Sequence, residues 1–399
     1  MKPSMKRREL LSLFSSATGA ALLSAHAPGW AQGASRRAAS TTDRILILVE
    51  LKGGNDGLNT VVPYADATYY QLRNSIAIKP ADVIKLDERT GLHPELKAAQ
   101  PLWDKGELAI VQGVGYPQPN LSHFRSIEIW ETSSKSNEYL ADGWVTRGMK
   151  AGFGAQTAFT AEGVLIGSND FGPLAGARAV TLNNPEAFVN QARFAMPTLA
   201  TGNAALQHVL RVENDVSVAA AGLRGEKYNF TAAFPQGQFG NAVRAACQVV
   251  ASQRGKAGVP VITLTLGSFD THQNQLGAHA NLLRQLGEGL AALNDGLTEL
   301  GAWDRTMVMT FSEFGRRPRQ NNSNGTDHGT VAPHFVAGGA VKGGLYGQAP
   351  DLMKLDSTQN VTWSTDFRQL YATVARDWWG VNPETVVRGQ FEPVAFLRA

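Results

Sequence analysis

A nearly continuous apolar run at residues 44–51, RILILVEL, constrains the fold of this chain more than any other feature. It ends in a glycine-rich turn, GGNDG, at residues 53–57. An apolar run without alternation is typical of a strand that is buried on both faces of a parallel sheet. Similar runs at residues 108–112, 259–266 and 306–311 predict three further strands.

The segment 279–300, between the last two predicted strands, has leucines spaced three and four residues apart, which predicts an amphipathic helix. Strand, helix and strand of this length predict a βαβ unit with a right-handed crossover. Two more helices are expected near residues 94–103 and 366–379. We therefore expect an α/β protein, a three-layer α/β/α sandwich with a mostly parallel sheet.

The first 31 residues resemble an export signal. Arg7 and Arg8 precede a mildly apolar run at residues 10–25, and Gly29 and Ala31 fit the small positions before a cleavage site. The pattern predicts a twin-arginine signal peptide over residues 1–31, so the partner would be the twin-arginine export machinery and the location periplasmic or secreted. The alternative is an ordinary amphipathic or disordered N-terminus. The run is shorter than the roughly 20 apolar residues of a membrane span, and no later segment is long enough.

The remaining chain divides into a linker at residues 32–43 and a single domain at residues 44–399. A less regular stretch at 150–240 is expected to be an insertion or a cap over the sheet. Residues 1–31 hold four basic residues and one acidic residue, which accounts for the whole of the chain's net charge of +3. The rest is neutral, which argues against nucleic-acid binding driven by positive charge.

Cys247 is the only cysteine, so an intramolecular disulfide and a cysteine-based metal site are both excluded. It lies in an apolar helical pattern at residues 243–250. We expect a buried structural thiol.

Acidic residues and histidines follow the predicted strands, at the edge where open parallel sheets bind their ligands. Carboxylates from separate loops repel one another unless a cation neutralises them. We therefore expect one or two divalent metal ions, with zinc, manganese, calcium or magnesium as candidates. The candidate ligands are Asp56, Asp270, His272, Glu313, Asp327 and His328. For any one of these residues, a helix cap or an ordinary surface position is the alternative.

The segment PNLSHFRS at residues 119–126 is expected to open a helix that continues to residue 131. Ser122 can cap this helix or act as a nucleophile, and both interpretations remain open. His123 is a candidate metal ligand or acid–base group, and Arg125 is a candidate clamp for an anion. Asn59 and Arg316 are further candidates for contact with an anionic substrate, although the basic loop 316–319 also fits a solvated turn.

Six segments together resemble one family of exported bacterial proteins, the domain of unknown function 1501 family, which is related to the alkaline phosphatase and sulfatase superfamily. They are residues 51–59, 91–94, 122–124 with 130–132, 269–272, 312–316 and 326–329. The resemblance implies an alkaline-phosphatase-like fold. It also implies two metal ions at the strand ends, held by Asp and His, and a nucleophile at a helix start.

By this resemblance, Asp56 matches the ligand after the first strand, and Ser122 takes the place of the nucleophile. Asp270 and His272 match a later ligand pair, and Asp327 with His328 match the last histidine-bearing loop. Glu313 and Phe314 stand where the superfamily often has an Asp-His pair, which puts that ligand in question.

The function implied by the resemblance is an exported metal-dependent hydrolase of phosphate esters, or less favourably of sulfate esters, acting on an anionic small molecule or a polysaccharide ester. Ser122 lacks the Cys/Ser-x-Pro-x-Arg context of formylglycine sulfatases, which disfavours their mechanism. The alternative is a catalytically inactive binding or surface-assembly module that keeps the fold. A nucleotide-binding oxidoreductase is disfavoured, because residues 53–57 lack the G-x-G-x-x-G spacing.

Overall fold

Strand β1 (Ile45–Leu51) lies inside the main sheet, and all of its residues are buried. The computed structural model describes residues 41–153, 159–182, 184–192, 204–224, 227–253 and 258–398. Within these residues, nine strands form the main sheet, in the order β13-β5-β12-β9-β1-β8-β6-β7, with β14 also paired to β5. The other strands of this sheet are β5 (Leu108–Gly115), β6 (Gly163–Ile166), β7 (Ala179–Leu182), β8 (Val261–Leu266), β9 (Thr306–Phe311), β12 (Ala332–Ala337), β13 (Gly344–Gly347) and β14 (Thr365–Asp366).

Two small sheets accompany the main one: β2 (Val61–Val62), β4 (Gly91–Leu92) and β3 (Ile84–Lys85) form the first, and β10 (Gly315–Arg316) with β11 (His328–Gly329) the second. The α-helices are α1 (Gly57–Thr60), α2 (Ala67–Leu72), α3 (Gln100–Asp104), α4 (His123–Thr132), α5 (Trp144–Gly152), α6 (Pro185–Gln191), α7 (Ala204–Leu223), α8 (Gln238–Ser252), α9 (Gln275–Glu299), α10 (Phe367–Thr373) and α11 (Pro383–Val387). Short 3₁₀ helices are η1 (Thr41–Asp43), η2 (Pro94–Ala99), η3 (Gly172–Leu174) and η5 (Trp303–Arg305), and η6 (Val374–Trp378) is a π-helix.

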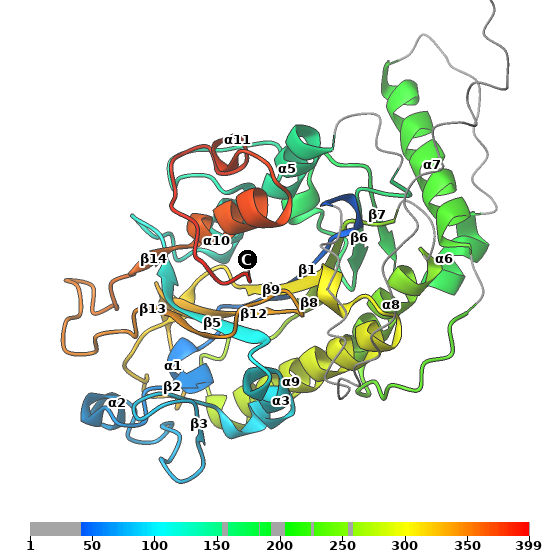
Figure 1. Ribbon diagram of the computed structural model, residues 1–399. Helices are drawn as coiled ribbons and strands as arrows, with labels where there is room; N and C mark the ends of the chain where they lie inside the picture. The colour runs from blue at the N-terminus through cyan, green and yellow to red at the C-terminus, as the bar shows by residue number, and fades with distance from the viewer. Residues whose placement is uncertain are drawn as a thin grey trace, which may run out of the picture. The chain divides into compact units, whose positions relative to one another are not determined.

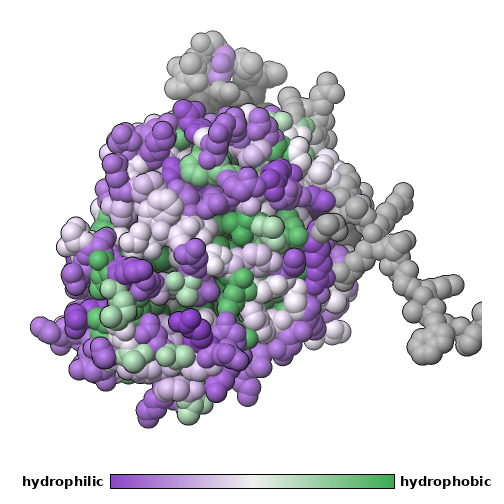
Figure 2. Space-filling view, turned by 60° about the vertical axis from the view of Figure 1, so that its left-hand side comes forward, coloured by the Kyte–Doolittle hydropathy of each residue, from purple (hydrophilic) through white to green (hydrophobic). Residues whose placement is uncertain are grey.

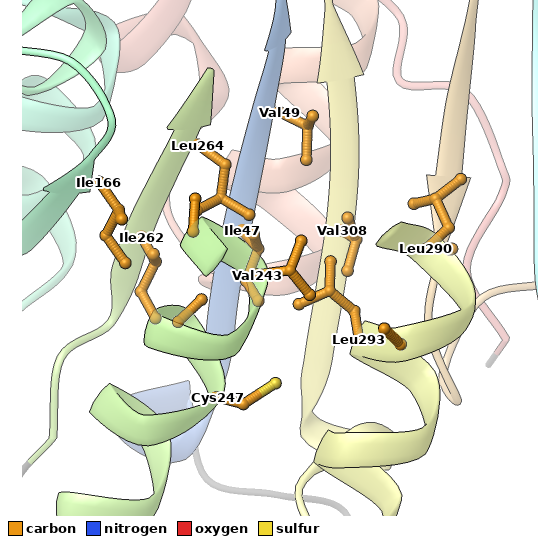
Figure 3. Close-up of a cluster of buried hydrophobic side chains, with 14 of the residues drawn as sticks. Ile47, Val49, Ile166, Val243, Cys247, Ile262, Leu264, Leu290, Leu293 and Val308 are labelled. Atoms are coloured by element: carbon orange, nitrogen blue, oxygen red, sulfur yellow. The ribbon is translucent and has the colours of Figure 1, made fainter. Parts of the chain in front are cut away.

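Helices cover both faces of the main sheet (Figure 1). Successive residues of β1 point to opposite faces, so Ile47 and Val49 belong to one core cluster and Leu46 and Leu48 to another. The first cluster packs α8 and α9 against the sheet, and its view in Figure 3 shows Val243 of α8 and Leu293 of α9 beside the strands. The second cluster packs α4, α5, α10 and α11 against the other face. These two cores make the three layers.

The sheet topology brings several loops to one edge. Strands β8 and β9 run parallel to β1 on either side of it. Strand β12 runs antiparallel to both β9 and β5, so β5 has the same direction as β1. The loops that follow β1, β5, β8 and β9 therefore leave the sheet at the same edge as the loop that enters β12.

The fold class predicted from the sequence, an α/β sandwich with a mostly parallel sheet, is confirmed. The predicted strands at 44–51, 108–112, 259–266 and 306–311 correspond to β1, β5, β8 and β9, and the predicted helix at 279–300 is the larger part of α9. The βαβ unit is present, but β1 lies between β8 and β9, so the helix connects strands that are not neighbours.

Two predicted helices are each divided. The stretch 94–103 forms 3₁₀ helix η2 followed by α3, and 366–379 contains α10 followed by the π-helix η6. Part of the stretch 150–240, expected as an insertion or cap, instead extends the main sheet. Strand β6 pairs with β8 and β7 pairs with β6, both in parallel. These two strands are only four residues long, so their apolar pattern is too short to stand out in the sequence.

Cys247 is fully buried, as the sequence predicts, and burial raises the pKa of its thiol to about 12. The predicted signal peptide and residues 32–40 of the linker lie outside the described residues. Across the described segments, no helix combines the length and the apolar character that crossing a bilayer requires. The face drawn in Figure 2 is largely hydrophilic, with hydrophobic residues in small areas among the hydrophilic ones.

Candidate metal centre

Three imidazole rings surround the carboxylate of Asp270 in the loop after β8. Oδ1 of Asp270 lies 3.0 Å from Nε2 of His272 and 3.1 Å from Nε2 of His328. Oδ2 of the same carboxylate lies 3.5 Å from Nε2 of His123. Ligand-type atoms of His123, Asp270 and His328 all lie within 4.8 Å of one another. We call Asp270 and the three histidines, His123, His272 and His328, the histidine–aspartate cluster.

The other ring nitrogen of each histidine has an acceptor of its own. Nδ1 of His328 donates to the Leu121 carbonyl at 2.8 Å, since a carbonyl can only accept. Nδ1 of His123 lies 2.8 Å from Oε1 of Glu313, and Nδ1 of His272 lies 3.3 Å from Oδ1 of Asp327. Each ring thus turns its Nε2 toward Asp270 while its Nδ1 faces another acceptor. Metal-binding histidines are oriented in this way, by an acceptor on the nitrogen that does not hold the metal.

The cluster has the donor set of a metal site. Nε2 of His272 and Nε2 of His328 are only 3.0 Å apart. Two lone pairs at this distance repel each other unless a proton or a cation lies between them. Burial lowers the pKa of His328, which favours the neutral imidazole that binds metal. The imidazole nitrogens of His123 and His328 and a carboxylate oxygen of Asp270 lie close enough together to share a divalent ion such as zinc.

Arg316 keeps the Asp270 carboxylate ionised. Burial alone would raise the pKa of Asp270, but the hydrogen bond and the charge of the Arg316 guanidinium lower it to about 2. The same guanidinium donates to the carbonyls of Gly53, Gly54 and Thr326. Arg316 is thus buried and fully engaged. The expectation that it contacts an anionic substrate is not supported, because its donors already hold three loops together.

Glu313, predicted as a ligand, contacts the candidate ligand His123. Its buried carboxylate accepts from the backbone N–H groups of Gly53 and Gly54, at 2.9–3.1 Å, and from His123. The turn after β1 must therefore bring its backbone close to other loops. Gly53 has a φ of +119°, and a Cβ there would lie 2.4 Å from the Asp270 backbone nitrogen. This contact explains why glycine stands at this position.

Asp327 also acts on a histidine and lies at the outer side of the cluster. Its Oδ1 faces Nδ1 of His272 and accepts from Nδ2 of Asn321 at 3.1 Å. The hydrogen bond from Asn321 lowers the pKa of Asp327. We therefore place Asp327 with Glu313, as carboxylates that orient imidazole rings.

Asp56 and Asn59 are not brought to the cluster. Both are buried, and both accept from Nη1 of Arg73, which is itself fully buried. Burial would raise the pKa of Asp56, but the charge and hydrogen bond of Arg73 hold it below its ordinary value. Asn59 also donates to the Ile76 carbonyl and accepts from the Tyr69 hydroxyl. The expectations of Asp56 as a metal ligand and Asn59 as a substrate contact are corrected, because both side chains belong to an internal network.

This network makes a testable prediction for stability. Replacing Arg73 by methionine leaves the buried Asp56 carboxylate without its cation, and breaking a buried ion pair from one side costs about 3–5 kcal/mol. We expect the free energy of unfolding of Arg73→Met, measured by urea denaturation, to fall by about that amount. Arg284→Met is the control, because Arg284 pairs with Glu288 on the exposed face of α9. A loss below about 1 kcal/mol in Arg73→Met would contradict the structural role of the pair.

Ser122 stands at the N-terminus of α4, beside the histidine–aspartate cluster. It is the N-cap residue, but its side chain makes no capping hydrogen bond, and it is exposed. The residues on either side both contact the cluster, through the Leu121 carbonyl and the His123 ring. The sequence left two interpretations of Ser122 open, a helix cap and a nucleophile. The hydroxyl makes no capping hydrogen bond. It is available for chemistry.

Arg125, predicted as an anion clamp, is directed elsewhere. Its guanidinium donates to the carbonyls of Lys135, Ser136 and Glu138, pairs with Glu128 at 2.8 Å and lies over the Tyr139 ring. Arg125 therefore fixes the loop after α4. These contacts do not bring Arg125 to the cluster, so its role as an anion clamp stays a prediction.

Two contributions to the site were missed by sequence reasoning. The Leu121 carbonyl orients His328, and no sequence signal marks a backbone acceptor. Phe314 packs against the rings of His123 and His328, with centroids 4.8 and 4.5 Å away. In the sequence, Phe314 stands where the related superfamily often has a histidine. That difference was visible, but the packing of Phe314 against the two histidine rings was not inferred from it.

The fold and the cluster define an α/β protein with a candidate metal centre at the carboxyl edge of its sheet. A family model, "Protein of unknown function (DUF1501)", matches residues 175–390, more than half of the chain. The chain therefore belongs to this family, which confirms the family predicted from the motifs. Among curated proteins, none matches this chain in sequence.

Several solved structures show a distant likeness. Ps i-CgsB has a TM-score of 0.42 and 11% identity, covering 88% of this chain and 75% of its own. The C-terminal periplasmic domain of EcEptC from Escherichia coli, in complex with Zn, has a TM-score of 0.38 and 11% identity, covering 85% and 82%. A protein in the alkaline phosphatase superfamily from Vibrio parahaemolyticus has a TM-score of 0.37 and 9% identity, covering 88% and 70%. TM-scores this low carry no conclusion about activity.

Proposed function

We propose that this protein is an exported, metal-dependent hydrolase of phosphate esters. The observation that carries the proposal is the histidine–aspartate cluster, in which three imidazoles turn their Nε2 atoms toward one carboxylate beside an uncommitted serine hydroxyl. A cluster built only for stability has no need to hold two imidazole nitrogens 3.0 Å apart. Sulfate esters are the less favoured substrates, and the metal is one or two divalent ions, with zinc favoured by the donor set.

Each residue of the cluster has a role in this proposal. A bound divalent ion would supply Lewis-acid polarisation of a phosphoryl oxygen, and His123, Asp270, His272 and His328 would hold it. Glu313 and Asp327 keep the proton on Nδ1 of His123 and His272, and the Leu121 carbonyl does the same for His328. Arg316 keeps Asp270 charged at all pH values near neutrality.

Ser122 is the proposed nucleophile. Its Oγ forms a bond to phosphorus, the bond from phosphorus to the alcohol oxygen breaks, and the alcohol leaves with a proton from solvent. The proton of the Ser122 hydroxyl passes to water. Water then attacks the phosphoserine and releases inorganic phosphate, which restores the serine.

The helix start offers a place for the phosphate charge. The first N–H groups of α4 have no intrahelical acceptor, and the positive end of the helix dipole favours an anion. Asn59, Arg125 and Arg316 make structural contacts instead of the anion contacts expected from the sequence. In this proposal the N–H groups at the start of α4 bind the phosphate in their place. Export is part of the proposal on the strength of the Arg7-Arg8 pattern in residues 1–31.

The first test is the metal content of the protein cut after Ala31 and purified without chelators, measured by elemental mass spectrometry. We expect one or two equivalents of a divalent metal. We also expect hydrolysis of an aryl phosphate, which stops when a chelator removes the metal and returns when the metal is added back. Bound metal without turnover on phosphate or sulfate esters would favour the binding or surface-assembly module. Absence of metal uptake on titration would overturn the metal centre itself.

A further inference from the structure

The segment between β5 and α4 carries two groups of the candidate centre. The Leu121 carbonyl contacts the His328 ring, and Ser122 is the proposed nucleophile. Residues 116–122 are all described, and they form neither a strand nor a helix. A segment outside regular secondary structure needs other hydrogen bonds to hold its backbone in one place. We call residues 116–122 the nucleophile loop.

The Tyr116 hydroxyl supplies such hydrogen bonds. Its oxygen accepts from the Asn120 N–H at 3.1 Å, and the Asn120 carbonyl lies 3.3 Å from the same oxygen. Oδ1 of Asn120 accepts in turn from the Ser122 N–H at 2.9 Å. Tyr116 is itself buried, and its ring packs edge-on against Phe367, with 5.7 Å between the centroids. A fixed hydroxyl therefore holds Asn120, and Asn120 holds the backbone of Ser122.

The same hydroxyl connects the nucleophile loop to the loop after β9. It lies 2.7 Å from Oγ of Ser126, a fully buried residue of α4, and Oγ of Ser126 donates to the Glu313 carbonyl. A serine hydroxyl has one proton and a carbonyl can only accept, so the Tyr116 hydroxyl is the donor to Ser126. Burial raises the pKa of Tyr116, so the hydroxyl keeps this proton near neutral pH.

These contacts form one chain of hydrogen bonds through Asn120, Tyr116, Ser126 and Glu313. One end of the chain holds the Ser122 backbone, and the other end is the residue whose carboxylate lies 2.8 Å from the His123 ring. The two loops follow different strands, β5 and β9, so contacts between them fix their separation. We propose that Tyr116 is a positioning residue, which sets the place of the Ser122 hydroxyl relative to the histidine–aspartate cluster.

The inference rests on the proposed function, since the place of Ser122 affects the rate only if Ser122 attacks the ester. Reacting atoms must lie about 3–3.5 Å apart and aligned, and a displacement of about 1 Å can cost about 100-fold in rate. Without the Tyr116 hydroxyl, the loop adopts more positions, and fewer of them are productive. A hydroxyl that only stabilised the fold would change the amount of folded protein and leave the kcat of the folded protein unchanged.

The kinetic test is Tyr116→Phe, which removes the hydroxyl and keeps the ring. With an aryl phosphate as substrate, we expect kcat per metal-loaded protein to fall about 10–100-fold and KM to change less than about twofold. Ser126→Ala should lower kcat in the same way. The double variant should lose little more than the more affected single variant, because both substitutions break the same chain. Losses in kcat that multiply in the double variant would contradict a shared chain.

Tyr346→Phe is the matched control. The Tyr346 hydroxyl donates to the Lys342 carbonyl at 2.7 Å, and the ring packs edge-on against Phe396, so the substitution removes a similar hydroxyl from β13. Its kcat should equal that of the wild type. An equal loss of kcat in Tyr346→Phe, or an unchanged kcat in Tyr116→Phe, would overturn the positioning role.

Hydrogen exchange gives a second readout that does not depend on activity. The Asn120 N–H loses its acceptor in Tyr116→Phe, so a peptide covering residues 117–122 should exchange about three- to tenfold faster, and a peptide from β1 should not change. Unchanged exchange in residues 117–122 would overturn the inference even if the enzyme is active. Wild-type protein that does not hydrolyse esters would overturn the proposed function, and exchange alone would then decide whether Tyr116 holds the nucleophile loop.

Discussion

Replacing Asp270 by asparagine is expected to remove metal binding and ester hydrolysis together. The substitution keeps the shape of the side chain but removes the negative charge that faces all three imidazoles. Loss of a group that only orients a ligand costs about 10–100-fold in metal affinity, so loss of the shared carboxylate should cost about 100-fold or more. Metal content by elemental mass spectrometry and affinity by competition with a chromogenic chelator give the two readouts.

Asp351→Asn provides the matched control for this variant. Asp351 is an exposed carboxylate that pairs with Lys354, 3.5 Å away. Its removal should change neither metal content nor rate. Thermal unfolding of both variants shows whether the fold survives, because Asp270 also pairs with the buried Arg316. A folded Asp270→Asn variant that carries the wild-type amount of metal would refute the assignment of the centre.

The sequence predicted that the loops of the candidate centre meet at one edge of the sheet, but it did not predict the contacts that several of their residues make. Continuous apolar runs reveal buried parallel strands, and parallel strands that end at one edge bring their loops together there. This reasoning places Asp270, His272 and His328 at the sheet edge. Their meeting depends further on β12, which runs antiparallel and so begins at the same edge that β8 and β9 reach. No local pattern announces that reversal.

Residue roles depend on partners that are distant in the chain and carry no local signal. Asp56 follows β1 just as Asp270 follows β8, and both have the same residue type in the same context. Arg73, from the end of α2, reaches one of them, and Arg316 with three imidazoles surrounds the other. Sequence spacing alone could not show that one of two similar carboxylates forms an internal ion pair and the other belongs to the candidate metal centre.

Glu313 shows a second physical limit. A glutamate after a strand fits a metal ligand equally well in the sequence, but two backbone N–H groups of the neighbouring turn take its oxygens. That turn has the required conformation because Gly53 and Gly54 adopt positive φ angles. The glycines were visible in the GGNDG motif, but the sequence did not show that their N–H groups would bind Glu313. The same arrangement affects His123, because the acceptor on its Nδ1 directs its Nε2 toward Asp270, as in a metal-binding histidine.

Replacing Ser122 by alanine is expected to lower kcat for phosphate esters by about 10³-fold or more while metal content stays unchanged. The hydroxyl makes no capping hydrogen bond, so the variant should also keep its stability within about 0.5 kcal/mol, whereas removing a true N-cap costs about 0.5–2 kcal/mol. Ser122→Thr, which retains a hydroxyl, should recover part of the lost rate. Together with Asp270→Asn, these variants separate the nucleophile from the metal centre. A Ser122→Ala variant that binds metal and hydrolyses esters at the wild-type rate would assign the attack to water and leave Ser122 without a catalytic role.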